Sequence, residues 1–360
     1  MPELVKSNPD QPYELKPLPP PNDFESKPTL RALINTIQEV SELKGYCSKV
    51  PNPRILLSIT MMKESVESSE IEEIHTTVES VLKSQVIKES ERRGPDKETL
   101  RYREALDWGF NNLGQWGLST RLILGIHKVL MKSNVGYRKQ QNAIKNTGAG
   151  DIIYTPPIAS KINELIQNWE NFVNHPEASK IHPLVRCAIA HYQFEAIHPF
   201  SDGNGRVGRI LLALQFVTEK LLDFPVLFTS TYFNENRADY YRTLNKVTRS
   251  NDWENYVLFA LEGFRVQAGE TKKKLFTMIE IYEDLIKRIR EDHSKIKAVE
   301  TADHLFTYPF TNATYFSKGL GIHYTTAQRH LAGLKDSNIL RDFWVGKRHL
   351  YFFPEITKII

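Results

Sequence analysis

Twelve consecutive residues near the middle of the chain combine a base, a carboxylate, an amide, two arginines and three glycines. They run from His198 to Arg209 and read HPFSDGNGRVGR. Glycines let the backbone come close to a ligand, and a glycine-rich turn that opens a helix leaves several backbone N–H groups unpaired. Such a turn binds anions. A long apolar run, from Leu184 to Ile197, precedes it and predicts a helix, so the local frame is helix, loop, helix.

The charged side chains of this run suit a nucleoside triphosphate. Arg206 and Arg209 are three residues apart, so on the second helix they share a face and can form forked hydrogen bonds with different phosphates. Asp202 would repel phosphates unless a cation lay between, which favours a role as a Mg2+ ligand. The sequence therefore predicts a nucleotide-binding set that consists of Gly203, Asn204, Gly205, Arg206, Val207, Gly208 and Arg209.

His198 is the candidate catalytic residue. A neutral imidazole, with an ordinary pKa of about 6.5, can accept a proton from a hydroxyl near neutral pH. An isolated His before Pro more often caps the preceding helix, because proline biases the residue before it away from the helical region. The loop that follows His198 favours catalysis instead. It is neither a Walker A loop, since it lacks the G-x-x-x-x-G-K-[ST] pattern, nor a dinucleotide fingerprint, since no strand precedes it.

The run HPFSDGNGR followed by VGR resembles the signature HPFx(D/E)GNGRxxR of Fic-domain proteins, whose best-known members transfer AMP from ATP to target hydroxyls. The resemblance extends over about three quarters of the chain, from near residue 65 to the end. It implies a mainly α fold: a Fic-type helical bundle with a small β-hairpin flap and a C-terminal winged helix-turn-helix domain. It also implies a protein adenylyltransferase with ATP as co-substrate, Mg2+ as cofactor, His198 as base and Asp202 as metal ligand.

The segments 137–144 and 152–157 are similar to the two sides of the family's flap, a hairpin that lies over the active site. A Gly-Ala-Gly turn at 148–150 between short apolar runs supports a hairpin, and the prolines that follow stop strand pairing from spreading. In the family, the flap holds an extended piece of the target protein through backbone hydrogen bonds. The resemblance assigns this positioning to Ile153, Tyr154 and Thr155.

Upstream, apolar residues recur at near-helical spacing from Met61 to Gln85 and predict one amphipathic helix. Within it, Ser68 and Glu72 resemble the family's inhibitory motif (S/T)xxxE(G/N), whose Glu pairs with the second arginine of the loop. The resemblance implies that Glu72 contacts Arg209 and keeps ATP from binding productively.

Three observations leave alternatives open around these assignments. Ser69 and Glu72 also fit a capping box, and Glu-rich helix faces are usually solvated. Position 73 departs from the inhibitory motif, since Glu73 stands where the family prefers Gly or Asn. Tyr240 and Tyr241 occur where related proteins place a tyrosine pair near the nucleotide; we assign a contact to Tyr241, although paired tyrosines are more often core residues.

Three regions are expected along the chain. Residues 1–110 hold a proline-rich arm, with eight of the 19 prolines before residue 29, and helices near 30–45 and 97–114. Residues 111–265 form the catalytic core. Residues 266–360 begin with a charged connector helix from about 272 to 299 and end in a winged helix. In this winged helix we expect helices over 312–320 and 324–337 and strands over 339–343 and 349–353.

Charge and composition bear on partners and location. Residues 300–360 carry seven Lys or Arg against five Asp or Glu, and the chain has a net charge of +4, which is low for a duplex-DNA binder. The winged helix is therefore expected to contact protein, with a DNA-binding, nucleotide-sensing regulator as the alternative. The sequence is also compatible with other Fic reactions, which use another nucleotide as donor or remove AMP. It is equally compatible with a homodimer. The chain has only two cysteines, no long apolar run and no signal-like N-terminus. We therefore expect a cytoplasmic protein without membrane contact.

Overall fold

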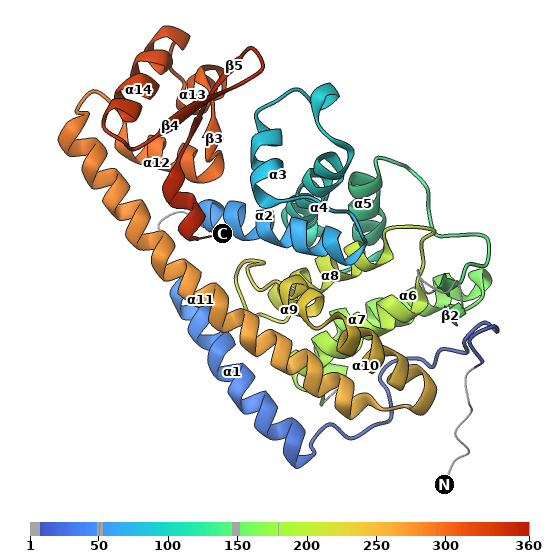
Figure 1. Cartoon of the computed structure of the whole chain (residues 1–360). Coiled ribbons are helices and arrows are strands. Elements are labelled where there is room, and N and C mark those ends of the chain that lie inside the picture. Colours follow the sequence, from blue (N-terminus) through green and yellow to red (C-terminus); the bar gives the residue numbers. More distant parts are fainter. Residues whose placement is uncertain (1–7, 49, 51–52, 146–151, 179, 360) are drawn as a thin grey trace.

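The computed structural model describes residues 8–48, 50, 53–145, 152–178 and 180–359, and these residues are mainly helical (Figure 1). The first half contains helices α1 (Lys27–Cys47), α2 (Pro53–Ile71), α3 (Val78–Gln85), α4 (Gly94–Trp116), α5 (Thr120–Met131) and α6 (Ile162–Asn174). The second half contains α7 (Pro183–Ile197), α8 (Asn204–Thr218), α9 (Ser230–Glu235), α10 (Arg237–Ser250), α11 (Trp253–Asp292), α12 (Ala298–Thr307), α13 (Ala313–Leu320) and α14 (Tyr324–Asp336). The expected mainly α architecture is confirmed.

Helices α7 and α8 form the centre of the catalytic region. Almost every side chain of α7 is buried, as its largely apolar sequence predicts, and the buried residues include the polar Arg186, His191 and Gln193. Helix α8 is also buried over most of its length, and α4, α6 and α11 pack around the pair. The loop 198–203 joins two helices that are fixed by packing on all sides. The predicted helix, loop, helix frame is confirmed.

The proline-rich arm lies across the surface and then enters α1. The side-chain amide of Asn168 bonds the backbone of Leu18 twice, at 2.7 and 3.0 Å. Ser26 then caps α1 by accepting the N–H of Thr29 at 3.3 Å, with proline in the first turn. Helix α1 packs along α11, and Figure 1 shows the two side by side.

The prediction of one helix from Met61 to Gln85 is wrong, because the chain breaks after Ile71. Residues 72–77 separate α2 from α3, and Thr77 begins α3 by accepting the N–H of Ser80 at 3.2 Å. The break lies at Glu73, whose φ of 61° is left-handed and cannot continue a right-handed helix. Apolar residues recur at the same near-helical spacing on both sides of the break, so the sequence pattern does not reveal it.

The charged connector is part of a longer helix than the sequence indicated. Helix α11 begins at Trp253, inside the expected catalytic core, and ends at Asp292, so the boundary near residue 265 falls within it. A helix up to residue 299 is also wrong, since α12 starts separately at Ala298. The apolar first half of α11 packs in the core, and the charged second half continues the same helix, so the change in composition marks no break in structure.

The C-terminal part follows the expected order of helix, turn, helix and two strands. Strands β4 (Arg341–Val345) and β5 (Arg348–Phe352) pair antiparallel, and a strand that the sequence did not indicate, β3 (Phe310–Thr311), pairs with β5. Phe310 and Leu350 share a small apolar cluster with α2 and α3. The C-terminal part thus packs against the helix that carries the candidate inhibitory residues.

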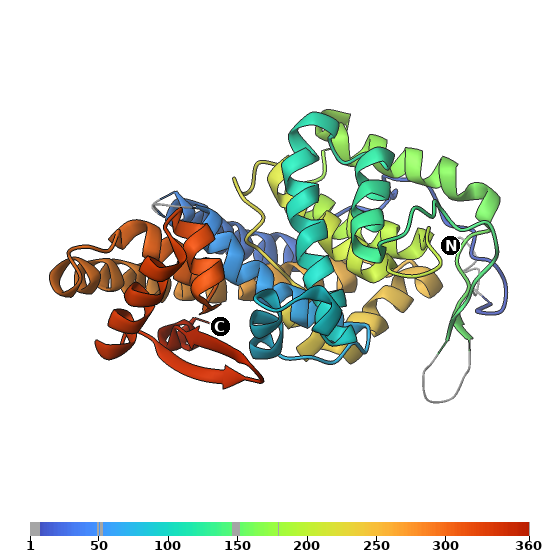
Figure 2. The ribbon, with the colours of Figure 1, turned by 90° about the horizontal axis from the view of Figure 1, so that it is seen from above.

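A short hairpin lies at the opposite end of the molecule (Figure 2). Strands β1 (Ile144–Lys145) and β2 (Ile152–Tyr154) pair antiparallel, with Ile144 opposite Tyr154. The expected Gly-Ala-Gly turn lies outside the described residues. Among the helices described, none combines the length and the hydropathy needed to cross a bilayer.

Candidate active site

The loop after α7 is closed by hydrogen bonds within it. His198 ends α7 with a φ of 49°, and Gly203 turns the chain into α8 with a φ of 82°. The Asn204 amide accepts the N–H of Phe200 and donates to its carbonyl, both at 2.8 Å. Phe200 is fully buried, and its ring stacks on His127 at 3.8 Å. The loop is therefore held in one shape from both ends.

The first turn of α8 offers N–H groups to a ligand. The first backbone bond of the helix runs from the N–H of Val207 to the carbonyl of Gly203, at 3.0 Å, so the N–H groups before Val207 have no helical partner. They lie at the positive end of the helix dipole and suit an anion. The side chain of Asn204 is already engaged with Phe200, so it is the backbone of Asn204 that faces this position.

Val207 and Gly208 do not take the nucleotide-binding places that the sequence suggested. The side chain of Val207 is fully buried and its N–H is bonded within the helix, so neither faces a ligand. A Cβ at Gly208 would lie 2.1 Å from Oε1 of Glu195, which shows that this glycine makes room for the carboxyl of α7. Both residues lie on the face of α8 that turns toward the core.

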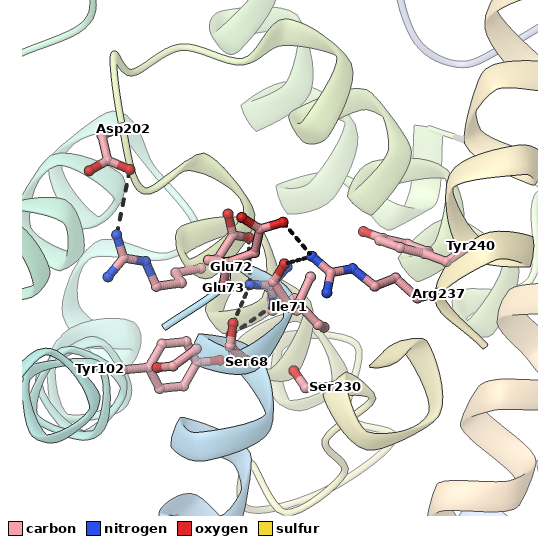
Figure 3. A network of polar contacts seen from close by, with 12 residues as sticks. Ser68, Ile71, Glu72, Glu73, Tyr102, Asp202, Ser230, Arg237 and Tyr240 are labelled. Carbon is pink, nitrogen blue, oxygen red and sulfur yellow. Dashed lines mark hydrogen bonds and ion pairs between the residues drawn. The ribbon is translucent and has the colours of Figure 1, made fainter. Parts of the chain in front are cut away.

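Arg209 and Glu72 form the contact that the resemblance implied. Figure 3 shows Glu72 together with Ser68, Glu73 and Arg237. Arg209 donates to the hydroxyl and carbonyl oxygens of Ser68 and to Oε1 of Glu72, each at 2.8 Å. Its side chain is only 2% exposed. Although burial acts to raise the pKa of Glu72, the charge and hydrogen bond of Arg209 hold that pKa below its ordinary value. Glu72 is therefore ionised and fixed against the arginine.

Glu72 also lies against the start of α8. A Cβ at Gly205 would be 2.3 Å from Oε1 of Glu72 and 2.9 Å from a guanidinium nitrogen of Arg209. Only glycine leaves room for this approach. The carboxylate of Glu72 thus lies at the end of the helix where its dipole and unpaired N–H groups favour negative charge.

The left-handed backbone of Glu73 explains why this position of the motif favours Gly or Asn. These two residue types adopt positive φ at low cost. The Glu73 side chain lies 3.9 Å from Arg237 and is half exposed. The capping-box alternative is wrong, because Ser69 lies inside α2 and its hydroxyl donates to the carbonyl of Ser65 at 2.7 Å.

Arg206 and Asp202 lie on the side of the loop that is away from the contact between Glu72 and Arg209. Arg206 is buried beside Glu98 of α4, at 3.4 Å, and beside Asp202, at 3.5 Å. Asp202 itself is 70% exposed and available to a ligand. No three His, Cys, Asp or Glu side chains gather into a metal site within the described part of the chain. A single exposed carboxylate fits Mg2+, which keeps most of its shell for water and phosphate oxygens.

The environment of His198 keeps its imidazole neutral. Burial lowers its pKa to about 4, and its buried Nδ1 has no hydrogen-bond partner among the residues that the structure describes. Its backbone carbonyl accepts a hydrogen bond from Nε of Arg138 at 3.0 Å. A neutral ring can accept a proton at pH 7.

Arg138 ties the flap to the catalytic loop, a role that the sequence did not single out. Besides the carbonyl of His198, its guanidinium donates to the carbonyls of Gln140, at 3.1 Å, and Pro157, at 2.5 Å. Its own N–H donates to the carbonyl of Pro199 at 2.8 Å. One buried arginine thus joins the loop to both sides of the hairpin.

The three flap residues face in different directions. The Tyr154 side chain turns inward, and its hydroxyl donates to the carbonyl of Ala196 at 2.7 Å. Thr155 is also buried, and its hydroxyl donates to the carbonyl of Pro9 in the N-terminal arm at 2.6 Å. Ile153 is half-buried. Tyr154 and Thr155 therefore anchor the hairpin, whereas Ile153 is less buried than either of them.

The tyrosine pair on α10 divides between core and surface. Tyr240 is buried, and its hydroxyl lies 2.9 Å from Nε2 of His191. Tyr241 is 44% exposed. Burial raises the pKa of Tyr241, and the nearby charge of Glu72 raises it further, which places this ring beside the candidate site.

Two buried carboxyl groups near Arg209 were not found from the sequence. Glu64 accepts from Tyr102 at 2.7 Å and from Ser230 at 2.5 Å, and burial raises its pKa to about 7. Burial likewise raises the pKa of Glu195 to about 7. Glu195 lies within the largely apolar sequence of α7, whereas Glu64 stands between Lys63 and Ser65, so the local sequence does not distinguish it.

Comparison with known proteins yields three family matches in succession. Residues 30–111 match the Fic/DOC family N-terminal domain, residues 117–216 the Fic/DOC family, and residues 281–356 the C-terminal domain of protein adenylyltransferase SoFic-like proteins.

Among curated relatives, protein adenylyltransferase fic-1 of Caenorhabditis elegans is 35% identical over 92 residues, which are 26% of this chain and 17% of that protein. Protein adenylyltransferase Fic of Drosophila grimshawi is 31% identical over 106 residues, 29% of this chain and 20% of that protein. The chain thus spans a fifth or less of the length of these relatives.

Two solved structures share the fold. A Fic family protein from Desulfovibrio desulfuricans G20 has a TM-score of 0.54 at 21% identity, covering 93% of this chain and 98% of that one. Fic-1 from C. elegans has a TM-score of 0.50 at 20% identity, covering 69% of this chain and 74% of that one.

Proposed function

Because this chain is a Fic/DOC family protein, we propose that it is a protein adenylyltransferase that moves AMP from Mg-ATP to a Tyr, Ser or Thr hydroxyl of a target protein or of itself. The observation that carries this proposal is the geometry of the loop. A neutral His198 lies at its start and the unpaired N–H groups of α8 at its end. A base next to an anion cradle is what transfer from a nucleotide to a hydroxyl needs.

In the proposed reaction, the imidazole of His198 takes the proton of the target hydroxyl. The hydroxyl oxygen forms a bond to the α-phosphorus as the bond to the β-phosphate oxygen breaks, and pyrophosphate leaves. The N–H groups at the start of α8 receive negative charge on the phosphate in the transition state. Mg2+, held by Asp202 and phosphate oxygens, would supply further charge neutralisation when bound.

Two arginines and one tyrosine complete the proposed nucleotide site. Arg206 and Arg209 would hold the β- and γ-phosphates, since they lie three residues apart in the first turns of α8 and can reach different phosphates. Tyr241 would contact the nucleoside. Preorganised groups of this kind each contribute on the order of a hundredfold or more to the rate.

Glu72 would hold this enzyme in an inhibited state. Its carboxylate engages Arg209 and lies against Gly205, so a phosphate that approached either residue would meet a negative charge. ATP bound without Arg209 would lack a partner for its γ-phosphate, and its α-phosphorus would not align with the incoming hydroxyl. Release of α2 would remove the block.

The hairpin would position the target. The N–H of Tyr13 in the arm donates to the carbonyl of Thr155 at 2.9 Å, so the arm covers the chain just beyond β2. The edge of β2 around Ile153 remains for an extended target segment, which would pair with it through backbone hydrogen bonds. The segment would then pass in front of His198.

The proposal is tested with ATP labelled at either the α- or the γ-phosphate, on a Glu72→Gly protein incubated with Mg2+. Transfer of AMP leaves α-label and no γ-label on protein, and a Glu72→Gly/His198→Ala double variant leaves neither. Retention of γ-label would indicate a kinase and would sink the proposal. Competition by unlabelled UTP, CTP or GTP shows whether ATP is the preferred donor.

A further inference from the structure

Buried polar side chains follow one face of α4, where it packs against α2 and α3. This set, the polar row of α4, consists of Asp96, Thr99 and Tyr102, which are spaced three residues apart and are at most 1% exposed. A helix face that packs against other helices is usually apolar, because a buried polar group is costly unless it is hydrogen-bonded. Each member of the row meets this condition through a polar side chain of α2, of α3 or of the link between them.

Asp96 accepts hydrogen bonds from three hydroxyl groups. Its Oδ1 accepts from Thr76 at 2.5 Å, and its Oδ2 accepts from Ser80 at 2.9 Å and from Ser84 at 2.8 Å. Thr76 belongs to the link 72–77, whereas Ser80 and Ser84 lie one turn apart on α3. One buried carboxyl group thus joins the link and α3 to the first turn of α4.

The rest of the row contacts α2 itself. The hydroxyl of Thr99 donates to that of Ser69 at 3.3 Å, and the hydroxyl of Tyr102 donates to Glu64 at 2.7 Å. Figure 3 shows Tyr102 pointing from α4 toward α2. The two helices run antiparallel, so the row extends from the middle of α2 to the start of α3. Glu72 lies between the residues that the row binds.

The backbone around Glu72 is held from two sides. Towards α2, three N–H groups bond back onto carbonyls of its last turn, each at 3.0 Å: those of Glu72, Glu73 and Ile74. On the other side, Thr76 joins the link to Asp96 only four residues after Glu72. Loss of the Thr76 hydroxyl would release the far end of the link. The position of Glu72 would then depend on the last turn of α2 and on its own contact with Arg209.

We propose that the polar row of α4 positions Glu72 against Arg209, with Asp96 as the positioning residue of the link. This inference rests on the inhibitory role of Glu72 proposed above. A polar attachment suits a segment that must come away, because hydroxyl groups that leave Asp96 find a partner in water, whereas an apolar attachment would expose apolar surface. Residues outside the inhibitory motif would then set the strength of inhibition.

Hydrogen exchange of the full chain without nucleotide tests this positioning independently of catalysis. Thr76→Val removes the hydroxyl and keeps the branched shape, so exchange at the N–H groups of residues 72–74 should become about tenfold faster or more. Thr76→Ser is the matched control, since it keeps the hydroxyl and should exchange like wild type. Exchange in α7 should stay unchanged in both variants. Unchanged exchange at residues 72–74 in Thr76→Val, or an equal increase in α7, would overturn the proposal.

A second pair of variants tests the acceptor. Asp96→Ala should also speed exchange at residues 72–74, and Asp107→Ala is its matched control, because Asp107 is an exposed carboxyl group of the same helix that accepts from Asn111 at 3.1 Å. Since Thr76 and Asp96 form one contact, Thr76→Val should change exchange less than about twofold once residue 96 is alanine. A full additional effect would mean that Thr76 acts through another group, and would overturn the assignment to Asp96.

Transfer of AMP separates this inference from the proposed function. Thr76→Val should raise transfer severalfold when Glu72 is present, and should change it less than about twofold in a Glu72→Gly protein, because it acts only through Glu72. A marked loss of transfer in the Glu72→Gly background would indicate a general structural role and would overturn the inference. If Glu72→Gly itself transferred no AMP, the proposed function would fail, and the exchange measurements would still decide the role of Asp96.

Discussion

Replacing Glu73 by glycine should strengthen the inhibition. Residue 73 adopts a left-handed φ of 61° directly after the end of α2. A non-glycine residue is strained by about 1 to 2 kcal/mol in this conformation, and glycine removes that strain. Glycine also gives the released segment more conformational freedom, which offsets roughly 0.5 kcal/mol of the stabilisation. The contact of Glu73 with Arg237, at 3.9 Å between half-exposed groups, adds only a few tenths of a kcal/mol at most.

The free energy that favours the inhibited position of α2, in which Glu72 contacts Arg209, should therefore rise by about 0.5 to 1 kcal/mol. The fraction of molecules in which α2 is released from this position should fall roughly two- to fivefold. AMP transfer by Glu73→Gly should fall by the same factor relative to wild type. The assay is initial incorporation of α-labelled AMP into protein at saturating Mg-ATP, with equal protein concentrations.

Two matched variants separate backbone strain from charge. Glu73→Asn should fall between wild type and glycine, because Asn tolerates the left-handed region. Glu73→Ala removes the carboxylate but keeps the strain, so it should resemble wild type. The reasoning is refuted if Glu73→Gly is as active as wild type or more active, or if Glu73→Ala reduces transfer as much as glycine does.

Three further outcomes follow from other groups. Because burial lowers the pKa of His198 to about 4, the rate of a Glu72→Gly protein should persist to about pH 5 in a pH–rate profile; an acid limb near 6.5 would contradict this. Burial raises the pKa of Glu195 to about 7. Its protonated form therefore contributes fully to the stability of the folded state below about pH 4.5, and this contribution is lost as the pH rises through 7. In thermal unfolding, the melting temperature of Glu195→Gln should rise relative to that of wild type between pH 5 and 8. Tyr154→Phe removes the bond to Ala196, worth about 1 kcal/mol, and should reduce transfer to an added target while nucleotide affinity, measured by calorimetry, stays within about twofold.

The catalytic loop could be predicted from sequence because its residues are contiguous. The order His198, Asp202, Gly203, Arg206 already places a base, a carboxylate, a turn and an arginine on one loop, and the buried helices that flank it are visible as apolar runs. Contact between Glu72 and Arg209 spans 137 residues. Only the resemblance to a known family suggested it, since no local pattern reports such a distance.

Other features depend on tertiary packing and left little pattern to detect. The break after Ile71 interrupts a periodic segment without Gly or Pro, and only the family's preference for Gly or Asn at position 73 pointed to a left-handed residue there. Val207 and Gly208 stand at the two unspecified positions of the signature, and their side of α8 turns inward toward α7, which the sequence does not report. Arg138 acts through three carbonyl groups that are remote from each other in the chain.

The most direct test of the account compares label from α-labelled ATP on wild type, Glu72→Gly, His198→Ala and Glu70→Gly. Glu70 is the matched control, because it lies in the last turn of α2 and contacts His75 rather than Arg209. We expect strong labelling in Glu72→Gly, weak labelling in wild type and Glu70→Gly, and none in His198→Ala. Equal labelling of wild type and Glu72→Gly, or labelling that survives in His198→Ala, would contradict the account.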